Sequence, residues 1–550
     1  MPDVWFFVVV AVALAVALVL RVLVSRSVAE AAGKFPPERE RRSHRRAGWL
    51  AFAALAAGAA LLVRFRDPIL DWRAHVLAAP HSAMQFAITW LATASYIYLM
   101  SVFAVYAVLL IFAIVENMVR STESRSEDFD HLLSSRFTIP VSVIVPVFNE
   151  ARVVLPVLRS LLRMRYSDFE VIVVNDGSTD DTLELVRREF DLEPHEMIIR
   201  EVIPTEEVNG VFFSADGDRR LPLLDKENGG KADALNCGLN CARYRYVCCV
   251  DGDTIYDSDA LLRGMRLAVE DPARVLAVTS HVAVASQPEE RNGGSGELID
   301  ATLLSNFQHS EYLRSFLNNR LAWSRLNFML CTSGAFTLWR RDVLANAGGF
   351  AKNFTCEDIE ITFRIHELYR RAGLDYRILS LPDTVAKTEA PAHIRSLIAQ
   401  RARWQRVTLE TVWHYRRMIG NPRYRAVGVV GLPFYIISEV LAPFGELVAF
   451  ASLGLAAFYG VVSWPVYAVF VGILCFANAA LTAVAIVLED IASRTYRLRH
   501  LVRLVLLAPF ELILYRPILV WARLKGTWGF FRRDRTWDKF ERNPREALPA

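Results

Sequence analysis

Long apolar runs occur only towards the two ends of this 550-residue chain, and this distribution restricts its fold more than any other feature. Most of the runs are close to, or longer than, the roughly 20 residues that a helix needs to cross a bilayer. Between residues 116 and 425 no such run occurs. The sequence therefore predicts one water-soluble domain between two groups of membrane helices. The runs cover residues 4–24, 48–63, roughly 84–115, 426–460, 464–488 and 501–521.

Composition and charge also indicate a multi-pass membrane protein. Hydrophobic residues make up 53% of the chain, too many for an ordinary soluble protein. The loop 25–47 contains the basic run RERRSHRR, and short basic loops stay in the cytoplasm. Three N-terminal spans would then leave the soluble domain in the cytoplasm, at the inner or plasma membrane. The formal net charge of +4 is explained by basic residues next to the membrane runs, so no nucleic-acid partner is indicated.

The first apolar run has two interpretations. The sequence VAEAA around Ala31 faintly resembles a signal-peptide cleavage site. However, the run lacks a basic n-region and is longer than the usual h-region of a signal peptide. We therefore interpret it as a membrane anchor.

The seven cysteines show no CxxC pair and no histidine partner at zinc spacing. Cys248 and Cys249 are adjacent in an apolar run. This pattern predicts reduced cysteines in a core, and neither disulfides nor a zinc site.

The middle of the chain alternates strand-like and helix-like segments. Short runs rich in β-branched residues begin at 139 and 169, and each leads into a helical pattern. Residues 234–256 read as a helix followed by a strand, and another strand-like run follows at 275–284. This alternation predicts a mostly parallel sheet with helices on both faces. In such sheets ligands bind beyond the carboxyl ends of the strands.

Carboxylates follow two of the predicted strands. Asp176, Asp180 and Asp181 come at the end of one strand, and Asp251 and Asp253 follow VCCV. Several negative groups at one sheet edge repel each other unless a cation or a donor-rich ligand joins them. The Asp-Gly-Asp turn offers hard oxygen ligands for Mg²⁺ or Mn²⁺ bridging a diphosphate. The structural alternatives are an ordinary Asp-Gly turn and a helix cap at Asp180.

Two further motifs contain candidate polar groups. ENGGKADALN, residues 227–236, is a Gly-Gly-Lys turn that opens a helix, where backbone N–H groups and Lys231 would meet an anion. A surface lysine at a helix start is the alternative. TCEDIEITFRIHE, residues 355–367, has Asp358 three residues after Thr355. That spacing is nearly a capping box, so by itself it favours a structural role for Asp358.

QRARWQR, residues 400–406, lies about twenty positions before an apolar run. On a helix Gln400, Arg403 and Trp404 share one face, while Arg401 and Gln405 point elsewhere. An indole can stack under a sugar ring, and an arginine can neutralise a leaving diphosphate. The alternative is a helix that only grips lipid headgroups, through Arg395, Arg401 and Arg406.

These motifs, in this order along the chain, closely resemble those of the processive family 2 glycosyltransferases. The set is an Asp after the second strand, Gly-Gly-Lys, Asp-Gly-Asp, Glu-Asp and Gln-x-x-Arg-Trp before C-terminal spans. The family includes cellulose, chitin, hyaluronan and bacterial poly-N-acetylglucosamine synthases. The resemblance covers about residues 138–410 and continues more loosely to TWDKFER. It implies a Rossmann-like GT-A fold and inverting, metal-dependent transfer of a hexose from a UDP-sugar.

The resemblance also implies roles at the nucleotide. Asp176 matches the aspartate that contacts the uracil, and Lys231 matches the lysine near the nucleotide and phosphates. Asp251 and Asp253 match the pair that binds Mg²⁺ or Mn²⁺, with Asp251 also close to the nucleotide. Glu150, at the end of IPVSVIVPVFNE, is a further candidate for binding the nucleotide.

On the acceptor side, Asp358 matches the general base that takes the proton from the acceptor hydroxyl. Gln400, Arg403 and Trp404 match the helix that holds the diphosphate and the acceptor. CTSGAF, residues 331–336, is similar to the acceptor-side segment of the family. Many members have Thr directly before Glu-Asp, where this chain has Cys356, and this departure leaves the role of position 356 open.

The resemblance thus implies a synthase that extends a β-linked polysaccharide from a UDP-sugar and exports it through the neighbouring spans. The layout, with TWDKFER near the end and no long C-terminal domain, favours UDP-N-acetylglucosamine over the donor of cellulose. The implied partners are the growing polymer, the lipid bilayer and accessory export subunits. One alternative is a non-processive transferase that adds a single sugar to a lipid. Another is a non-catalytic channel or assembly partner whose site has decayed.

The predicted organisation has five parts. An N-terminal membrane region of about three helices covers 1–120, a linker 121–137 and the catalytic domain 138–410. Interfacial helices with two or three spans cover 411–521, and a basic tail covers 522–550. Three C-terminal spans would place that tail outside, against the positive-inside tendency. An interfacial helix plus a span within 426–460, and partial insertion of 501–521, are the alternatives.

Overall fold

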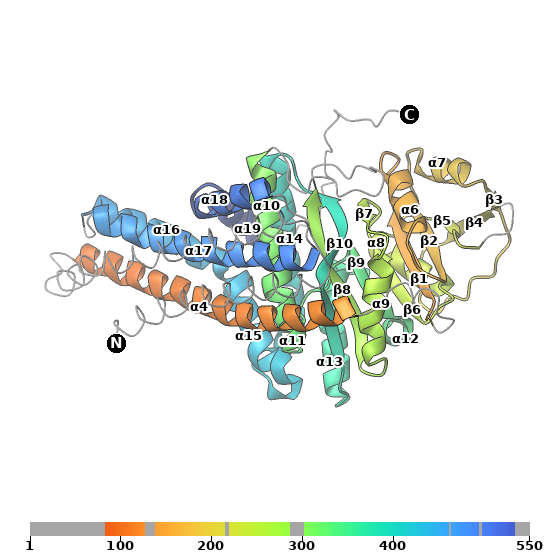
Figure 1. Cartoon of the computed structure of the whole chain (residues 1–550), viewed down its shortest axis with the longest axis horizontal. Coiled ribbons are helices and arrows are strands. Elements are labelled where there is room, and N and C mark those ends of the chain that lie inside the picture. Colours follow the sequence, from red (N-terminus) through yellow and green to blue (C-terminus); the bar gives the residue numbers. More distant parts are fainter. Residues whose placement is uncertain are drawn as a thin grey trace.

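The computed structural model describes residues 83–126, 138–214, 219–285, 302–460, 464–493 and 498–533. The predicted spans at 4–24 and 48–63, most of the linker 121–137 and residues 534–550 of the basic tail lie outside these ranges. Within them, an α/β domain lies at one end of an elongated molecule, and long helices extend from the other end (Figure 1).

Ten strands of the described chain form one mixed sheet, in the order β3-β4-β5-β2-β1-β6-β9-β8-β10-β7. The middle strands β5, β2, β1 and β6 run parallel to one another, as the alternation of strands and helices predicts. The strands are β1 Val141–Val147, β2 Phe169–Asp176, β3 Leu192–Pro194, β4 Val208–Ser214, β5 Leu223–Lys226, β6 Tyr246–Val250, β7 Thr254–Tyr256, β8 Val275–Ala285, β9 Phe336–Arg340 and β10 Arg377–Glu389.

The prediction of a mostly parallel sheet is wrong for the two sides of this sheet. β3, β4 and β5 pair antiparallel, and β9 lies antiparallel between β6 and β8. Only β8 and β10 add a parallel pair outside the middle, and β7 pairs antiparallel with β10. Antiparallel strands need only a short connection, whereas parallel strands need a long crossover. β3, β4 and β5 follow one another without a helix between them, so the helix–strand alternation on which the prediction rested gave no sign of their pairing. Helices do precede and follow β9, but the alternation does not indicate the direction in which that strand pairs.

Alternate residues of the middle strands enter two separate apolar cores. Val143 and Val145 of β1 lie in one core, and Ile144 lies in the other, together with Ile172 and Val174 of β2. All are fully buried, as expected for strands covered by helices on both faces. The helices of the domain are α6 Val154–Leu162, α7 Thr182–Glu189, α8 Lys231–Cys241, α9 Ala260–Glu270, α10 Leu303–Leu313, α11 Leu321–Arg325, α12 Arg341–Asn346, α13 Glu357–Arg371 and α14 Ile394–His414.

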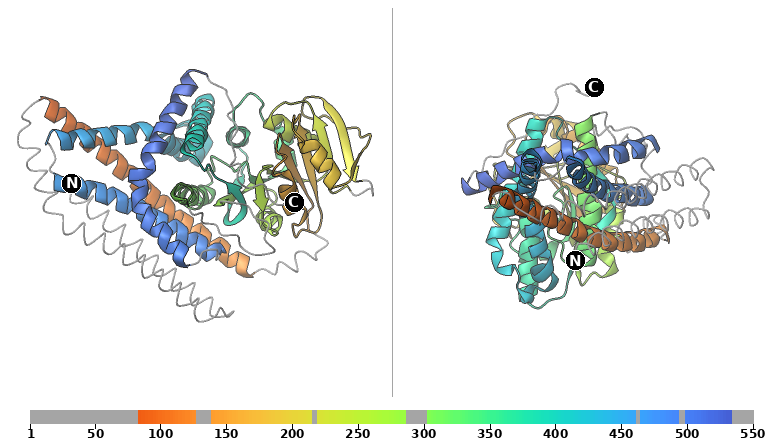
Figure 2. Two further views of the ribbon diagram at one scale, coloured as in Figure 1. Left: turned by 90° about the horizontal axis from the view of Figure 1, so that it is seen from above. Right: turned by 90° about the vertical axis from the view of Figure 1, so that its left-hand side faces the viewer.

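The long apolar helices are α4 Ala83–Ser126, α16 Ala442–Phe458, α17 Trp464–Ser493, α18 Leu498–Leu514 and α19 Arg516–Phe531. Of the described helices, α4 and α17 each contain a stretch long and apolar enough to cross a membrane. In two further places, two helical segments joined at a bend are long and apolar enough to cross a membrane only if the two segments together form one span. α4 packs against α16 and α17, and these helices run away from the sheet (Figure 2).

Both bent pairs fall where the sequence left alternatives open. The chain bends by 46° between Val427–Val440 and Ala442–Phe458, and by 49° between Val502–Leu514 and Arg516–Phe531. The predicted 426–460 and 501–521 runs are therefore broken, and neither is one straight helix. α14 continues through residue 410, which is the predicted end of the catalytic domain, and packs along α19.

All seven cysteines lie in the described residues and none forms a disulfide. Cys248 and Cys249 are buried in β6. The prediction that these two cysteines lie in a core is confirmed.

Candidate active site

The predicted cluster of carboxylates forms at the carboxyl ends of β1, β2 and β6. These strands are adjacent and parallel, so the loops that follow them meet at one edge of the sheet. Asp176, Asp251 and Asp253 border one cavity there, and Glu150 lies on its wall as well. The cavity has a volume of about 1820 Å³ and continues past α13 and α14 to the long apolar helices α4, α16, α17 and α18.

Lys231 links two carboxylates at the centre of this edge. Its Nζ lies 2.7 Å from Asp251 Oδ1 and 2.8 Å from Glu357 Oε1. Burial alone lowers the pKa of Lys231, but the carboxylates around it, chiefly those of Asp251 and Glu357, raise that pKa well above its usual value. Lys231 is therefore a fixed positive charge beside the Asp-Gly-Asp turn. The surface-lysine alternative does not hold.

Glu357 is a site residue to which the sequence reasoning gave no role. It precedes Asp358, is 5% exposed and holds the second ion pair of Lys231. Burial and the adjacent Asp358 raise the pKa of Glu357, and Lys231 partly offsets this effect. The only sequence signal for Glu357 was its place in the Glu-Asp motif, and that motif does not predict which of the two carboxylates pairs with Lys231.

The carboxylates at this edge suit a divalent cation whose remaining coordination positions are filled by other ligands. Among the residues that the structure describes, no group of three or more His, Cys, Asp or Glu side chains could hold a metal ion. Asp251 and Asp253 both line the cavity on the tight turn between β6 and β7. Two carboxylates leave most positions of a Mg²⁺ or Mn²⁺ ion to water and to phosphate oxygens. The residues present therefore fit a metal–diphosphate site.

Asp176 holds the Gly-Gly-Lys turn in place. Its Oδ1 accepts from Lys226 Nζ at 2.8 Å and from Gly229 N at 3.0 Å, and its Oδ2 accepts from Gly230 N at 2.8 Å. Lys226 is fully buried and also pairs with Asp233 at 2.6 Å. Asp176 thus joins the end of β2 to the start of α8. Its contact with a uracil stays a prediction.

The other two carboxylates after β2 have different surroundings. Asp180 Oδ1 accepts from Thr182 N at 3.0 Å in the first turn of α7, and its Oδ2 accepts from Ala151 N at 3.3 Å. This supports the structural alternative for Asp180. Asp181 is exposed and does not line the cavity.

Asp358 lies in the first turn of α13 and borders the cavity. Its Oδ1 accepts from Cys356 Sγ at 2.9 Å and from Ile359 N at 2.7 Å, and its Oδ2 accepts from Gly334 N at 3.1 Å. The predicted capping box is wrong, because the helix begins at Glu357 and position 356 is its N-cap. The Asp358 carboxylate is bonded to groups on the CTSGAF segment and position 356, so it is fixed at the cavity wall.

Gln400, Arg403 and Trp404 of α14 all border the cavity, and Trp404 is 40% exposed. The expectation that Arg401 and Gln405 point elsewhere is wrong, since both also border the cavity. Long side chains can bend back across a helix face, and α19 covers the other side of α14. The headgroup alternative is wrong for Arg401 and Arg406, which are buried, and only Arg395 is exposed.

Two family models match the chain. "Glycosyl transferase family 2" matches residues 142–344, and "Glycosyl transferase family group 2" matches residues 246–487. Together they run from β1 through the site described above to α17, which is more than half of the chain. The chain belongs to glycosyltransferase family 2. The family predicted from the motifs is confirmed, and the mixed α/β sheet fits the GT-A fold that this family implies.

Curated relatives of this family 2 member include poly-β-1,6-N-acetyl-D-glucosamine synthases. The proteins of Staphylococcus epidermidis and of Staphylococcus aureus strain COL are each 28% identical over 264 residues. That match covers 48% of this chain and 53% of each relative. The chain therefore spans about half the length of the curated relatives it matches.

Similar solved structures include a mannosyltransferase and TarS. The mannosyltransferase PcManGT from Pyrobaculum calidifontis, in complex with GDP-Man and Mn²⁺, has a TM-score of 0.44 and 20% identity, over 74% of this chain and 99% of that one. Residues 1–349 of S. aureus TarS in complex with UDP-GlcNAc have a TM-score of 0.32 and 17% identity, over 64% of this chain and 91% of that one.

Proposed function

We propose that this chain is a membrane-bound inverting glycosyltransferase that adds N-acetylglucosamine from UDP-N-acetylglucosamine to the end of a growing β-linked polysaccharide. The observation that supports this most directly is the single cavity that joins the Asp251–Lys231 edge, Asp358 and Trp404 to the membrane helices. The curated relatives are poly-β-1,6-N-acetyl-D-glucosamine synthases, which favours this donor sugar.

The donor diphosphate would bind at the carboxyl edge of the sheet. Lys231 supplies a fixed positive charge, and Asp251 and Asp253 would hold Mg²⁺ or Mn²⁺ against the phosphate oxygens. When bound, the cation neutralises the charge that develops on the leaving UDP. Arg403, on the cavity wall, would approach the same diphosphate.

Asp358 would act as the general base. The acceptor hydroxyl loses its proton to the carboxylate while its oxygen forms a bond to the anomeric carbon of the donor. The bond from that carbon to the diphosphate oxygen breaks, and UDP leaves with the electron pair. One in-line displacement inverts the anomeric centre, so an α-linked donor gives a β-linkage.

Trp404 would hold the acceptor end of the polymer. Its exposed indole faces the cavity between the donor edge and the membrane helices, where it can stack on a sugar ring. Beyond it the cavity wall contains polar side chains among apolar ones, which suits a hydrated polymer. Asn478 and Glu511 belong to this part of the wall. Each added sugar would move the polymer towards the membrane helices.

The test is a synthesis assay with the chain in lipid nanodiscs and Mg²⁺ or Mn²⁺. Radiolabelled UDP-GlcNAc, UDP-Glc and UDP-GlcA are supplied singly and in pairs, and the products are sized. We expect a high-mass product from UDP-GlcNAc alone. A product with one sugar on a lipid would instead support the non-processive alternative.

Asp358→Asn is the variant for this assay. The amide has nearly the same size but cannot take the proton, so transfer should fall by about 10²-fold or more. Binding of UDP, measured by titration calorimetry, should stay within a few fold of the native chain. Polymer synthesis at the native rate would contradict the role of Asp358 as base.

A further inference from the structure

Arg401 contacts two of the three motif residues on α14. Its guanidinium carbon lies 4.0 Å from the centre of the Trp404 ring, and its Nη1 donates to Gln400 Oε1. Tyr312 of α10 completes the packing, with its ring centre 6.1 Å from that of Trp404. The orientation of the proposed acceptor platform therefore depends on where Arg401 is held.

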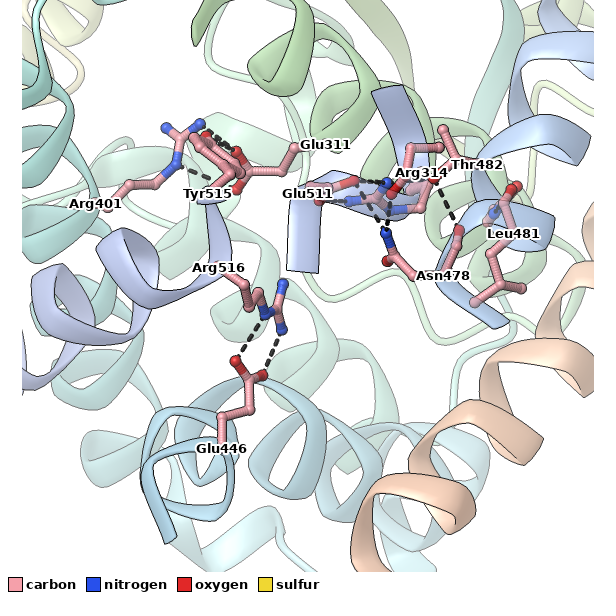
Figure 3. Close-up of polar contacts among 12 residues, drawn as sticks. Glu311, Arg314, Arg401, Glu446, Asn478, Leu481, Thr482, Glu511, Tyr515 and Arg516 are labelled. Atoms are coloured by element: carbon pink, nitrogen blue, oxygen red, sulfur yellow. Dashed lines mark hydrogen bonds and ion pairs between the residues drawn. The ribbon is translucent and has the colours of Figure 1, made fainter. Parts of the chain in front are cut away.

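Glu311 of α10 holds Arg401 in that place. Arg401 Nη2 donates to Glu311 Oε2 at 2.7 Å, and Arg401 Nε donates to Glu311 Oε1 at 3.2 Å (Figure 3). Arg401 is 3% exposed, while the Glu311 side chain is 22% exposed and lines the cavity. Burial alone would raise the pKa of Glu311, but Arg401 and Tyr515 hold it below its usual value, which keeps the carboxylate ionised.

Tyr515 joins the same carboxylate from the membrane side. Its hydroxyl donates to Glu311 Oε2 at 2.6 Å, and Tyr515 is the residue at the bend between α18 and α19. Its ring also stacks on Phe307 of α10 at 5.6 Å between ring centres. One carboxylate thus connects α10, the motif helix α14 and the broken helix pair.

We propose that Glu311, Arg401 and Tyr515 form a positioning cluster that sets Trp404 and Gln400 for the acceptor and links them to the bend of α18 and α19. The proposal rests on the proposed function, in which Trp404 binds the acceptor end of the polymer. None of the three residues is placed at the reacting atoms. They act through the side chains of α14.

The cluster has a specific consequence for the reaction. Loss of the Glu311 carboxylate leaves Arg401 buried without its bidentate partner, so Arg401 moves and the Trp404 ring tilts. Displacement of a substrate-holding group by about 1 Å costs about 10²-fold in rate. Donor binding at Lys231 and Asp251 should not change, because the described contacts of the cluster do not reach them.

The experiment compares Glu311→Gln, Arg401→Lys and Tyr515→Phe with the native chain in nanodiscs. Glu311→Gln and Arg401→Lys should each slow extension by about 10²-fold and raise the acceptor KM, since a lysine lacks the fork of donors and the planar stacking face. Tyr515→Phe removes one hydrogen bond and should give a smaller loss. UDP affinity and the temperature of unfolding are measured for each variant.

The matched control is Glu170→Gln, which removes the buried carboxylate of another arginine pair, in which the Arg243 side chain is 45% exposed. Glu170 Oε2 lies 2.7 Å from Arg243 Nε, Glu170 is 2% exposed, and neither residue lines the cavity. This variant should lose stability but keep its acceptor KM. A matching rise of the acceptor KM in Glu170→Gln, or unchanged acceptor kinetics in Glu311→Gln, would overturn the positioning role.

Failure of the proposed function gives a different result. A native chain that makes no polymer from any donor overturns that function before any variant is considered. The cluster is then tested by titration of a short β-linked N-acetylglucosamine oligosaccharide into native and Glu311→Gln protein. Weaker binding to the variant supports the cluster, and equal binding or no binding to either protein overturns it.

Discussion

At position 356 this chain has a cysteine where many family members have a threonine, and the cysteine makes a hydrogen bond that a threonine could also make. Cys356 Sγ lies 2.9 Å from Asp358 Oδ1, so its thiol donates to the proposed base. Burial and the carboxylates of Asp358 and Glu357 raise the pKa of Cys356 well above its usual value. The thiol therefore stays protonated and remains a donor at physiological pH. A threonine hydroxyl can make the same hydrogen bond.

This contact leads to a prediction for two substitutions. Cys356→Thr should keep transfer close to the native rate, because a donor to Asp358 remains. Cys356→Ala removes one hydrogen bond to a charged group and should cost about 2 kcal/mol, or roughly thirtyfold in rate. Initial rates of sugar incorporation at saturating donor are the measurement. Equal rates for the alanine and threonine variants would show that the thiol does not orient the base.

Lys231 leads to a prediction about the metal. Because its Nζ pairs with Asp251 and Glu357, these two carboxylates already have a positive partner. Removal of divalent cations with EDTA should therefore abolish transfer without lowering the temperature of unfolding. Mn²⁺ or Mg²⁺ added back should restore the activity. Full transfer in EDTA, with the cation content checked by mass spectrometry, would exclude the proposed metal site.

At the scale of elements, α14 packs closely against α19. A Cβ added at Gly526 would lie 2.2 Å from the carbonyl oxygen of Ala402, so only a glycine fits there. This contact holds the motif helix against the second half of the bent pair. The sequence contains no local signal for it, since the two residues are more than one hundred positions apart.

Gly526→Ala should separate the two helices and destabilise the protein by about 1–3 kcal/mol. Polymer synthesis should fall with it, because α14 also holds Trp404. Gly454→Ala on α16 is the matched control, as a Cβ there has no atom within 4 Å. Thermal unfolding in detergent and synthesis rates are compared for the two variants. A Gly526→Ala protein as stable as the control would mean that α19 does not pack on α14 in solution.

At the scale of the whole molecule, the cavity joins parts that the sequence presents as separate. It begins at the carboxyl edge of the sheet and ends among helices α4, α16, α17 and α18. Charged side chains in a membrane region normally face a protein interior or a water-filled path. The pairs Arg314–Glu511 and Arg516–Glu446 contribute residues to this wall (Figure 3).

This arrangement predicts synthesis coupled to export. In sealed inverted vesicles with the catalytic domain outside, polymer made from added UDP-GlcNAc should accumulate in the lumen. It should then resist an added hydrolase until detergent opens the vesicles. Polymer that is fully degraded before detergent is added would contradict coupled export, provided that the vesicles exclude a control enzyme.

The sequence by itself determined the family, the central α/β alternation and the residues at the strand ends. These follow from local patterns: apolar periodicity sets strands and helices, and the carboxyl ends of neighbouring parallel strands must meet. It also identified the motif helix and the two interrupted apolar runs. It did not determine the antiparallel pairings on both sides of the sheet, because β3, β4 and β5 have no helix between them and the alternation does not indicate the direction in which β9 pairs.

Only the tertiary structure decided how the side chains pair. Lys231 pairs with Glu357, Asp176 holds a glycine turn, and Arg401, for which headgroup binding was the alternative, pairs with Glu311. Each of these contacts joins residues far apart in the chain. Spacing along one helix predicts which residues share a face. Burial and charge pairing between elements decide which partner a long polar side chain contacts.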